Sequence, residues 1–571
     1  MDWYVVLDDA TRAAQTVLTD LRRVDEVTIP EVDDALAAGW ADGLHCFAWL
    51  PYDLGEAHLG IRGPAVGALY WFAEHTEGRR PLPDDPAFLA VAHPTVEQAA
   101  FTDRIALLQE AIAAGTTYQV NYTHAVRGRA VGAPEALYRR LRERQPAAFG
   151  VLAHLPGPAA PWTLSLSPEL FLDVDGETVT ARPMKGTASA DTDAHDLSTS
   201  PKDRAENLMI VDLLRNDLSR VAVPGTVAVP RLFEVERVGE LWQMTSTVTA
   251  RLAPGTTVGG LLDATFPCGS ITGAPKLSSM RLIRAVEAEP RGIYTGSMGL
   301  IEPAPGPLGW RLCLSVAIRT LEIDEDGDGS FGVGSGIVAD STAASEWAEC
   351  RAKAAFVTRL PESLRLKEAL RVIDGACPLG DLHQARLSAS ATDLGFPPPD
   401  DAIAEAVAET PHGSWRVGIE LLPNGRVEVS RTPLAPLTTP VDLLLAHAPW
   451  PDSPLARHKT SWRAHLDDAW RTAESFGAFD TIGHDDAGRV LEGGRSTVFA
   501  LVGGVWVTPP AWLGVLPGVQ RAALLLDPGP LGGGPLVERV LTIDELRAAD
   551  RIAVANAVRG VLPARLLDRK A

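Results

Sequence analysis

The sequence contains little cysteine and no long hydrophobic run. Its 571 residues include five cysteines, and no two of them form a C-x-x-C pair. Scattered cysteines are typical of a reducing compartment and provide no zinc-binding motif, so we expect all five to be small core residues. No apolar stretch approaches the roughly 20 residues that span a bilayer, and residues 1–4 do not begin a signal peptide. These absences predict a cytoplasmic protein without a membrane partner.

Positive charge is also scarce. The chain has 52 basic and 73 acidic residues, which gives a formal net charge of −21. This balance argues against a nucleic-acid-binding surface. An anionic substrate would therefore need local cations to draw it into so acidic a protein.

One acidic segment has an incomplete calcium-binding pattern. Residues 324–329, DEDGDG, match the first half of such a loop, but Ser335 stands where its last ligand, a glutamate, belongs. No helical pattern flanks the segment. We predict a solvated hairpin turn that joins strands at residues 312–323 and 331–338.

The chain is too long for a single hydrophobic core. Residues 1–95 hold short apolar segments broken by glycine and proline, which predicts the strands of an N-terminal lobe. Apolar residues at 101, 105, 108 and 112 have helical spacing, and Gly115 ends that helix. We expect residues 96–358 to form a larger domain, and a linker at 359–365 to lead to a second module at 366–571.

The most informative segment is residues 182–187, RPMKGT, where one lysine stands between a proline turn and a glycine. A lysine is a nucleophile only when neutral. Because its ordinary pKa is about 10.4, covalent work requires burial or a nearby cation, and Arg182 is one candidate for that cation. An isolated string of this kind is usually a surface turn, so the interpretation depends on the motifs around it.

Seven further blocks accompany this lysine in a fixed order. They are 167–169 (SPE), 205–217 (AENLMIVDLLRND), 269–276 (GSITGAPK), 291–296 (RGIYTG), 317–320 (AIRT), 334–341 (GSGIVADS) and 346–354 (ExxExxxKA). Over about residues 95–358 this order resembles the chorismate-utilising enzymes: anthranilate synthase, aminodeoxychorismate synthase component I, isochorismate synthase and salicylate synthase. The resemblance implies an α+β fold, with a two-sheet β-sandwich ringed by helices.

Chorismate is a dicarboxylate with an allylic hydroxyl, so its enzyme needs cations, an acid and a nucleophile. Glu206 stands near the start of one predicted helix, and Glu346, Glu349 and Lys353 share a face of another. Carboxylates from two helices suit magnesium. The resemblance makes Glu206 and Glu349 the Mg2+ ligands, with Glu346 acting through water, and Glu169 the general acid/base. It implies that substrate contacts come from Thr272, Tyr294, Arg319, Gly334, Gly336 and Lys353.

Two positions separate the reactions of this family. Anthranilate and isochorismate synthases usually carry alanine where this chain has Lys185, whereas aminodeoxychorismate synthase carries lysine. Isochorismate and salicylate synthases also need a water-activating lysine where this chain has Gln119. The resemblance therefore implies that Lys185 attacks C2 of chorismate as the C4 hydroxyl leaves, and that ammonia then attacks C4 and expels the lysine from C2. One departure is Gln243, which replaces a common histidine and cannot transfer a proton.

The chain shows no ammonia-producing domain of its own. None of the five cysteines lies in a G-x-C-x-G elbow followed by a suitable His/Glu pair. Ammonia must therefore come from a separate glutamine amidotransferase subunit or from ammonium salts.

The second module has a different set of motifs. They are 382–387 (LHQARL), 457–460 (RHKT), 491–499 (LEGGRSTVF), 516–519 (LPGV) and 556–560 (NAVRG). Together they resemble the fold-type IV pyridoxal-phosphate enzymes, which include aminodeoxychorismate lyase and D-amino acid aminotransferase. The resemblance implies a two-lobed α+β domain that dimerises with a second copy.

The same resemblance assigns the cofactor contacts. Lys459 would bind pyridoxal phosphate covalently and move protons, and Glu492 would pair with its ring nitrogen. Arg386 and the backbone amides at Gly518 and Val519 would hold the phosphate. At three positions this chain differs from the common family residue: Ala369 replaces threonine, Gln520 replaces threonine and Ala557 replaces serine. These changes remove phosphate and substrate contacts, so reduced activity remains an alternative.

The pairing of modules suggests the function, because the product of the first family member is the substrate of the second. We predict a fused aminodeoxychorismate synthase component I and lyase that makes 4-aminobenzoate and pyruvate, for folate or a specialised pathway. One alternative is an anthranilate synthase with a fused transaminase. Another is an active synthase with a non-catalytic C-terminal domain.

Overall fold

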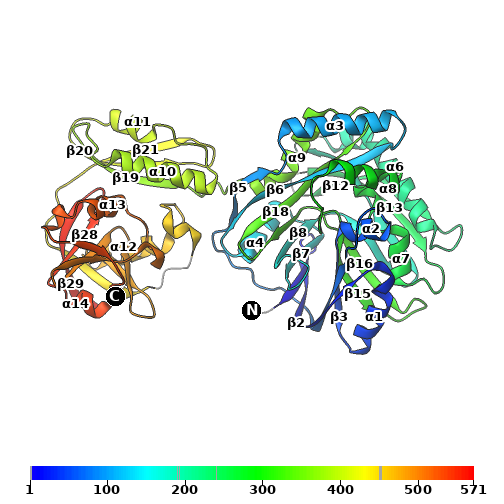
Figure 1. The fold of residues 1–571 in the computed structure, drawn as a ribbon, viewed down its shortest axis with the longest axis horizontal. Helices are drawn as coiled ribbons and strands as arrows, with labels where there is room; N and C mark the ends of the chain where they lie inside the picture. Colours follow the sequence, from blue (N-terminus) through cyan, green and yellow to red (C-terminus); the bar gives the residue numbers. More distant parts are fainter. Residues whose placement is uncertain (1–2, 190, 192, 239–240, 449–452, 571) are drawn as a thin grey trace. The chain divides into compact units, whose positions relative to one another are not determined.

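The structure is a computed structural model that describes residues 3–189, 191, 193–238, 241–448 and 453–570. The chain divides into two compact units, Met1–Arg359 and Leu360–Ala571 (Figure 1). No helix in the described part of the chain is long and apolar enough to cross a membrane. The narrower boundaries, a lobe ending at residue 95 and a linker over 359–365, stay predictions.

The first unit contains most of the strands. They are β1 (Tyr4–Asp9), β2 (Ala14–Val27), β3 (His45–Leu50), β4 (Gly67–Glu77), β5 (Phe88–Pro94), β6 (Gln119–Val131), β7 (Phe149–His154), β8 (Trp162–Ser167), β9 (Leu170–Asp175), β10 (Thr178–Arg182), β11 (Met184–Ser189), β12 (Ala228–Val238), β13 (Leu241–Arg251), β14 (Gly273–Ala274), β15 (Ser297–Pro303), β16 (Trp310–Val316), β17 (Thr320–Ile323) and β18 (Asp328–Ile337). Its α-helices are α1 (Val32–Ala41), α2 (Tyr52–His58), α3 (Gln98–Ala113), α4 (Pro134–Arg144), α5 (Ala194–Thr199), α6 (Pro201–Ser219), α7 (Val258–Thr265), α8 (Lys276–Val286) and α9 (Ala343–Thr358). Two 3-10 turns complete it, η1 (Ile29–Glu31) and η2 (Gly269–Ile271).

Antiparallel ladders join the strands of this unit into one hydrogen-bonded network of eighteen. The long strand β6 pairs with β5, β14 and β18, while β13 pairs with β10, β11 and β12. Helices cover the network, and α3 lies beside α9 (Figure 1). The predicted α+β class is confirmed.

Helix α3 illustrates how local pattern becomes packing. Phe101, Ile105 and Leu108 are all at most 1% exposed, and they join a hydrophobic cluster with Tyr122 on β6. Burying each such side chain contributes about 1.5–3 kcal/mol, which far exceeds the intrinsic preference of a short helix. The helix predicted from the spacing of these residues is confirmed.

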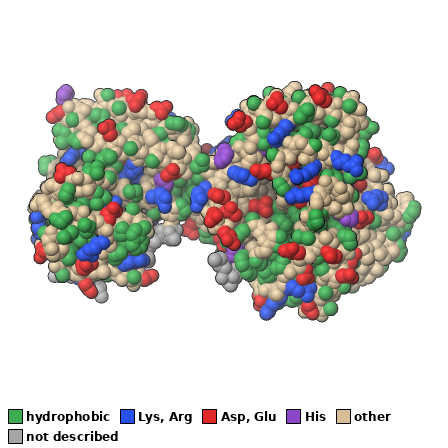
Figure 2. Space-filling model, in the orientation of Figure 1, with side chains coloured by type: hydrophobic (Ala, Val, Ile, Leu, Met, Phe, Trp, Pro, Cys, Tyr) green, Lys and Arg blue, Asp and Glu red, His purple; other side chains and the backbone are tan. Residues whose placement is uncertain are grey.

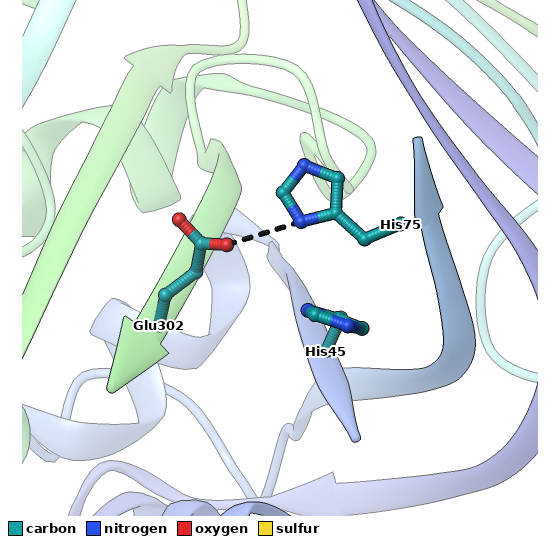
Figure 3. Close-up of side chains that lie close together, drawn as sticks. All are labelled: His45, His75 and Glu302. Carbon is teal, nitrogen blue, oxygen red and sulfur yellow. Dashed lines mark ion pairs between the residues drawn. The ribbon is translucent and has the colours of Figure 1, made fainter. Parts of the chain in front are cut away.

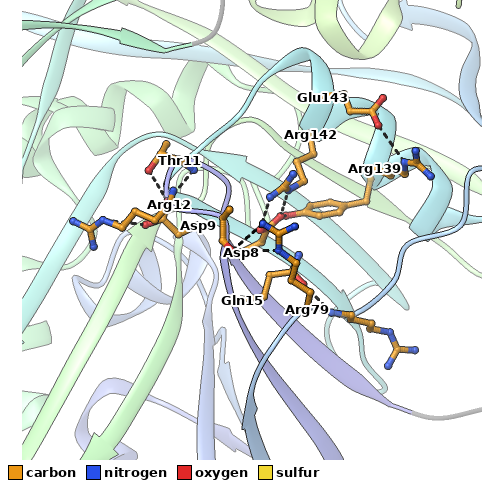
Figure 4. A network of polar contacts seen from close by, with 12 residues as sticks. Asp8, Asp9, Thr11, Arg12, Gln15, Arg79, Arg139, Arg142 and Glu143 are labelled. Carbon is orange, nitrogen blue, oxygen red and sulfur yellow. Dashed lines mark hydrogen bonds and ion pairs between the residues drawn. The ribbon is translucent and has the colours of Figure 1, made fainter.

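A buried ion pair attaches the N-terminal strand β1 to helix α4. Asp8 is 2% exposed, and its carboxylate accepts hydrogen bonds from Tyr138 at 3.1 Å and from two nitrogens of Arg142 (Figure 4). A buried carboxylate requires such partners, because desolvation would otherwise outweigh its interactions. Strand β1 is thereby fixed against the part of the unit that follows residue 95.

Two sequence expectations need correction here. Residues 312–323 form two strands, β16 and β17, because Arg319 has a left-handed backbone (φ 54°) that interrupts the run. The hairpin between β17 and β18 is confirmed, with Leu321 opposite Phe331. The cysteines do not all lie in the core, since Cys313 is exposed and Cys377 is partly buried.

The second unit contains two sheets. Its strands are β19 (Leu366–Ile373), β20 (Ser414–Leu421), β21 (Val427–Pro433), β22 (Val441–His447), β23 (Asp480–His484), β24 (Val490–Gly493), β25 (Thr497–Val502), β26 (Val505–Thr508), β27 (Leu536–Glu538), β28 (Arg551–Asn556) and β29 (Gly560–Lys570). Its helices are α10 (Gly380–Leu394), α11 (Ala402–Ala408), α12 (Ala464–Ser475), α13 (Val519–Leu526) and α14 (Ile543–Arg547), with 3-10 turns η3 (Pro454–Arg457), η4 (Ala511–Leu513) and η5 (Gly529–Leu531). Strands β19–β21 form an antiparallel sheet, and β22–β29 form a mixed sheet in which β22 runs parallel to β23 and β29.

The negative net charge is spread over the surface. Acidic and basic side chains are interspersed on the visible face of both units (Figure 2). Local clusters of cations, rather than one broad basic face, must therefore attract an anionic ligand.

Candidate active sites

Lys185 lies at an irregular point of strand β11. The ladder between β11 and β13 pairs Met184 with Thr245 and Thr187 with Gln243, so its register shifts between these pairs. Gly186 has a φ of +90°, a conformation that glycine adopts without steric cost. Such bulges redirect side chains next to functional sites. The proline and glycine around Lys185 thus shape the backbone that carries the amine.

Acidic and basic groups from three other elements act on the Lys185 amine. Burial lowers the pKa of Lys185, the positive charge of Lys353 lowers it further, and three carboxylates oppose both effects. The carboxylates are Glu169, Glu206 and Glu349. The structure therefore brings the predicted nucleophile, acid and metal ligands into one site.

The cation beside Lys185 is not the one suggested by the sequence. Arg182 is its neighbour in the chain, but the guanidinium pairs with Glu236 at 2.7 Å. Lys353, 168 positions further along, supplies the repulsion instead, because helix α9 carries it into the site. Successive side chains of a strand point to opposite faces, so a residue close to Lys185 in the sequence need not lie near its amine.

The environment of Glu169 shifts it toward its protonated form. Its side chain is 3% exposed, and burial raises its pKa, although the Ser270 hydroxyl and the Lys185 charge oppose that rise. Ser270 donates a hydrogen bond to Oε1 of Glu169 at 2.5 Å. Ser270 belongs to the block at residues 269–276, but nothing in the sequence of that block indicated a role for this serine.

Three carboxylates were predicted to surround a magnesium ion. Burial raises the pKa of Glu206 on α6, and the Glu349 charge on α9 adds to that rise. Burial also acts on Glu349, but its ion pair with Lys353 (2.6 Å) outweighs it and lowers the pKa of Glu349. Glu346 is 4% exposed. Within the described residues these three do not form a cluster of ligand atoms within 4.8 Å of one another.

The donor set nevertheless fits magnesium. Mg2+ takes oxygen ligands and usually binds through one or two carboxylates, with water and substrate oxygens filling the remaining positions. Glu206 and Glu349 lie on separate helices, and the Glu349 charge raises the pKa of Glu206, an effect that a divalent cation would oppose.

Arg319 and Lys353 are linked through helix α9 and strand β18. Arg319 donates hydrogen bonds to Gln145 at 3.0 Å and to the Lys353 carbonyl at 3.2 Å, while Nζ of Lys353 donates to the Gly334 carbonyl at 2.8 Å. Burial lowers the pKa of Arg319 to about 10, so its guanidinium remains charged at neutral pH. Two cations are thereby fixed by hydrogen bonds near each other, where they can attract a carboxylate.

The glycines of β18 make room for neighbouring side chains. A Cβ on Gly336 would lie 2.6 Å from Nε2 of Gln119, and one on Gly334 would lie 2.6 Å from the Tyr122 carbonyl. A Cβ on Gly332 would lie 2.1 Å from the Tyr294 ring. Gly332 was not singled out from the sequence, although the i, i+2 spacing with Gly334 could have indicated it.

The other predicted substrate residues differ in burial, and Tyr294 is only partly buried. Thr272 is 0% exposed and donates to the Cys268 carbonyl at 2.8 Å. Tyr294 lines a cavity of about 560 Å³, and burial raises its pKa. Gln243 is 2% exposed on β13, and its Oε1 has no partner among the described residues. It can accept a hydrogen bond from a ligand.

In the second unit, the five predicted cofactor residues line a single cavity of about 610 Å³. They are Arg386, Lys459, Glu492, Gly518 and Val519. Burial and the charges of Arg386 and Arg463 lower the pKa of Lys459 to about 7. A large fraction of this amine is thus neutral at physiological pH and able to bond with an aldehyde.

Glu492 lies in the same cavity. Burial raises its pKa to about 7, opposed by the backbone N–H of Leu516, which donates to Oε1 at 2.7 Å. A buried carboxyl of this kind gains from pairing with a protonated ring nitrogen. It therefore fits the role predicted from the resemblance.

A buried group that the sequence did not indicate fixes Arg386. Glu368 accepts two parallel hydrogen bonds from Arg386, at 2.8 and 2.6 Å, and lies 2.7 Å from Nδ1 of His383. Although burial alone would raise the pKa of Glu368, these partners lower it to about 2.

Arg386 also reaches the predicted phosphate site. Its third nitrogen donates to the Pro517 carbonyl at 3.3 Å, immediately before Gly518, the N-cap of α13. A guanidinium beside open helix N–H groups fits a phosphate. The chemistry of the residues present therefore fits pyridoxal phosphate.

Comparison with known proteins assigns both units to families. The family model for chorismate binding enzymes matches residues 70–359, half of the chain, and the chain belongs to that family. The model for class IV amino-transferases matches residues 365–567. The protein thus joins a chorismate-binding domain to a class IV aminotransferase domain, as the order of motifs predicted.

Individual relatives match about half of this chain. The chain is 39% identical to the aminodeoxychorismate synthase of Streptomyces griseus over 50% of this chain and 39% of that protein. It is 38% identical to anthranilate synthase component 1 of Streptomyces coelicolor, over 44% and 49% of the two chains. It is 38% identical to aminodeoxychorismate synthase component 1 of Salmonella typhimurium, over 44% and 54%. The chain therefore spans about half or less of the length of these relatives.

A solved structure supports the fold. The menaquinone-specific isochorismate synthase of Escherichia coli superimposes with a TM-score of 0.52 at 17% identity, over 63% of this chain and 89% of that one. At this identity the likeness concerns the architecture alone.

Proposed function

We propose that the chain is an aminodeoxychorismate synthase fused to an aminodeoxychorismate lyase. The first unit would convert chorismate and ammonia into 4-amino-4-deoxychorismate and water, and the second would split this product into 4-aminobenzoate and pyruvate. The observation that carries the proposal is the buried Lys185 amine, with its lowered pKa, beside Glu169. Sequence identity does not decide between reactions, because aminodeoxychorismate and anthranilate synthases match almost equally well.

The first reaction uses Lys185 as a temporary substituent. Neutral Nζ of Lys185 bonds to C2 of chorismate as the C4–O bond breaks, and Glu169 donates the proton that lets the hydroxyl leave as water. Ammonia then bonds to C4 while the C2–N bond breaks and frees Lys185. The proton that ammonia gives up restores Glu169.

The remaining residues of the first site bind and orient the substrate. Arg319 and Lys353 would hold carboxylate groups of chorismate. Glu206 and Glu349 would hold Mg2+, which when bound offsets the repulsion between a dianionic substrate and this acidic site. Without these charges the substrate would meet the protein's negative potential.

In the second unit, Lys459, Glu492, Arg386 and the N-terminus of α13 would hold pyridoxal phosphate. When bound, this cofactor supplies an electron sink for breaking a substrate C–H bond. Lys459 would take the proton from C4 of the aminated ring, and pyruvate leaves as the ring becomes aromatic. Arg416, Arg463 and Arg559 line the same cavity, which favours an anionic substrate over an apolar amino acid.

Two partners follow from the proposed chemistry. Three of the five cysteines are buried, and none stands in a glutaminase motif, so a separate glutamine amidotransferase subunit would supply the ammonia. A homodimer through the second unit is the proposed assembly.

The proposal is tested by incubating the pure protein with chorismate, ammonium, Mg2+ and pyridoxal phosphate, and separating the aromatic products. We expect 4-aminobenzoate, and accumulation of 4-amino-4-deoxychorismate when Lys459 is replaced by alanine. Anthranilate as the product would overturn the synthase assignment. Unchanged 4-aminobenzoate formation in the Lys459→Ala variant would overturn the lyase assignment.

A further inference from the structure

Two histidines and a glutamate from three neighbouring strands of the first unit come together outside the proposed active sites. His45 begins β3, His75 lies near the end of β4, and Glu302 lies near the end of β15. Strand β3 pairs with β4 on one side and with β15 on the other. Figure 3 shows the Glu302 carboxylate directed at the His75 ring, with the His45 ring beside them.

The distances between the possible ligand atoms of His45, His75 and Glu302 suit a shared metal ion better than direct hydrogen bonds. Each residue offers one ligand atom, and these atoms lie within 4.8 Å of one another. Nδ1 of His75 and Oε1 of Glu302 are 3.4 Å apart, which is long for a hydrogen bond. Tetrahedral zinc with bonds of about 2.0–2.1 Å places its ligand atoms about 3.3 Å apart. The pair therefore already has the spacing of two zinc ligands.

The third ligand needs a small adjustment. The rings of His45 and His75 have centroids 4.9 Å apart and are nearly perpendicular, at 84°. A rotation about the His45 side chain would bring one of its nitrogens closer to the other two atoms. The one ion pair that these rings make within the described part of the chain is that of His75 with Glu302 at 3.4 Å, and a shared metal would replace this contact.

The carboxylate is held in the orientation that a ligand requires. Arg311, opposite Glu302 on β16, donates to Oε2 through two nitrogens at 3.0 and 2.8 Å. Oε1 is thus left free to face the histidines. Partners of this kind, which orient a ligand without touching the metal, typically change metal affinity by about 10–100-fold when removed.

We propose that His45, His75 and Glu302 bind a divalent transition metal such as Zn2+, with water in the fourth position. Two imidazoles and one carboxylate favour zinc or cobalt over magnesium, which prefers oxygen ligands alone. The site would join β3, β4 and β15 at one end.

The position of this site suggests a stabilising role. Strand β15 begins immediately after the block at 291–296, which contains Tyr294. Tyr52 lies two residues after β3, and its backbone N–H donates to the Gly292 carbonyl at 2.8 Å. The metal would reinforce the β3–β15 ladder at the end opposite to the pair Leu50–Ser297, which adjoins the Tyr294 segment. Because the metal would bind only the folded unit, it would also raise the thermal midpoint of unfolding.

The test uses Co2+ as a spectroscopic probe on the full-length protein, stripped of metal and supplied with excess Mg2+ to occupy oxygen-only sites. We expect one equivalent of Co2+ to bind with the strong visible absorption of a tetrahedral complex, and Zn2+ to displace it. His75→Ala and His45→Gln should each weaken binding more than about 100-fold, whereas His412→Ala, at an exposed histidine of the second unit, should not.

Circular dichroism and chorismate-dependent activity establish that each variant is folded. Arg311→Ala provides a further readout, because it retains all three ligands and should weaken Co2+ binding by a smaller factor. If the wild-type protein binds no stoichiometric Co2+, or if both histidine variants bind it as tightly as the wild type, the proposal is wrong.

Discussion

Lys185 and Glu169 shift each other's protonation in one buried site. Each charge stabilises the other, yet burial outweighs this attraction and moves both groups toward their neutral forms: the pKa of Lys185 is lowered and that of Glu169 is raised. A neutral amine and a protonated acid are the forms that attack at C2 and departure of the C4 hydroxyl require. The same environment therefore prepares both partners.

This relationship predicts a bell-shaped pH profile for the proposed synthase reaction. As pH rises through the lowered pKa of Lys185 the amine becomes neutral and activity increases, and as pH rises through the raised pKa of Glu169 the acid is lost and activity falls. We expect Glu169→Gln to lower kcat by about 10²–10⁴-fold and to remove the falling limb. Measuring kcat/KM for chorismate against pH checks this. A falling limb that persists in the glutamine variant would assign the acid to another residue.

Cofactor binding should depend on pH through Lys459. Its pKa of about 7 means that the amine becomes charged below neutrality and can no longer bond with the aldehyde of pyridoxal phosphate. We expect the visible absorbance of the bound cofactor to fall as pH decreases through about 7, and to be absent in Lys459→Ala. Absorbance that stays constant down to an acidic pH would show that the amine lies in a different environment.

Glu368 should be essential to the cofactor site although the sequence did not predict it as a cofactor contact. Removing its charge leaves Arg386 and His383 without their buried partner, and breaking such a pair costs about 3–5 kcal/mol. We expect Glu368→Gln to lower the free energy of unfolding of the second unit by about 3 kcal/mol and to weaken pyridoxal phosphate binding. Urea unfolding and cofactor titration measure the two effects. Glu362→Gln, at an exposed glutamate, is the control, and an equal response from both variants would contradict the prediction.

The close contact between Gly332 and Tyr294 should control substrate binding. An alanine Cβ at position 332 would lie 2.1 Å from the aromatic ring and would displace it. We expect Gly332→Ala to raise KM for chorismate or to lower kcat/KM by at least about tenfold. Gly63→Ala, where a Cβ meets nothing within 4 Å, should leave both unchanged. Steady-state kinetics that do not distinguish these variants would mean that Tyr294 does not position the substrate.

Magnesium dependence should follow the two carboxylates on separate helices. Chelation is expected to abolish the synthase reaction, with recovery on addition of Mg2+, and Glu206→Gln should raise the Mg2+ concentration needed for half-maximal activity. His45→Gln should not change that concentration, because its nitrogen ligand belongs to a different site. If His45→Gln changes the Mg2+ concentration needed for half-maximal activity, or if Glu206→Gln does not, the metal that serves the reaction binds elsewhere than at Glu206 and Glu349.

The parts of the fold that the sequence indicated are those with local patterns. Helix α3 follows from four apolar residues at helical spacing, and the β17–β18 hairpin follows from two alternating runs around one acidic turn. Pairings between distant segments, such as β1 with β7 or β15 with β3, leave no comparable local pattern. The interruption at Arg319 was missed because a single left-handed residue does not disturb the alternation around it.

The candidate sites divide in the same way. Lys185, Glu169 and the cofactor residues could be singled out because each stands in a motif with an ordered set of neighbours. The hydrogen bond from Ser270 to Glu169 and the pairing of Glu368 with Arg386 arise only when separate elements pack together. The His45, His75 and Glu302 cluster spans three strands and has no metal-binding spacing in the sequence.

The covalent role of Lys185 is tested most directly by following amination of chorismate with ammonium in a Lys185→Ala variant that retains native circular dichroism and Mg2+ binding. We expect formation of 4-amino-4-deoxychorismate to fall by about 10³-fold or more, since the proposed mechanism forms the bond to C2 through this amine. An alanine variant that aminates the ring at the wild-type rate would contradict the mechanism and the assignment that rests on it.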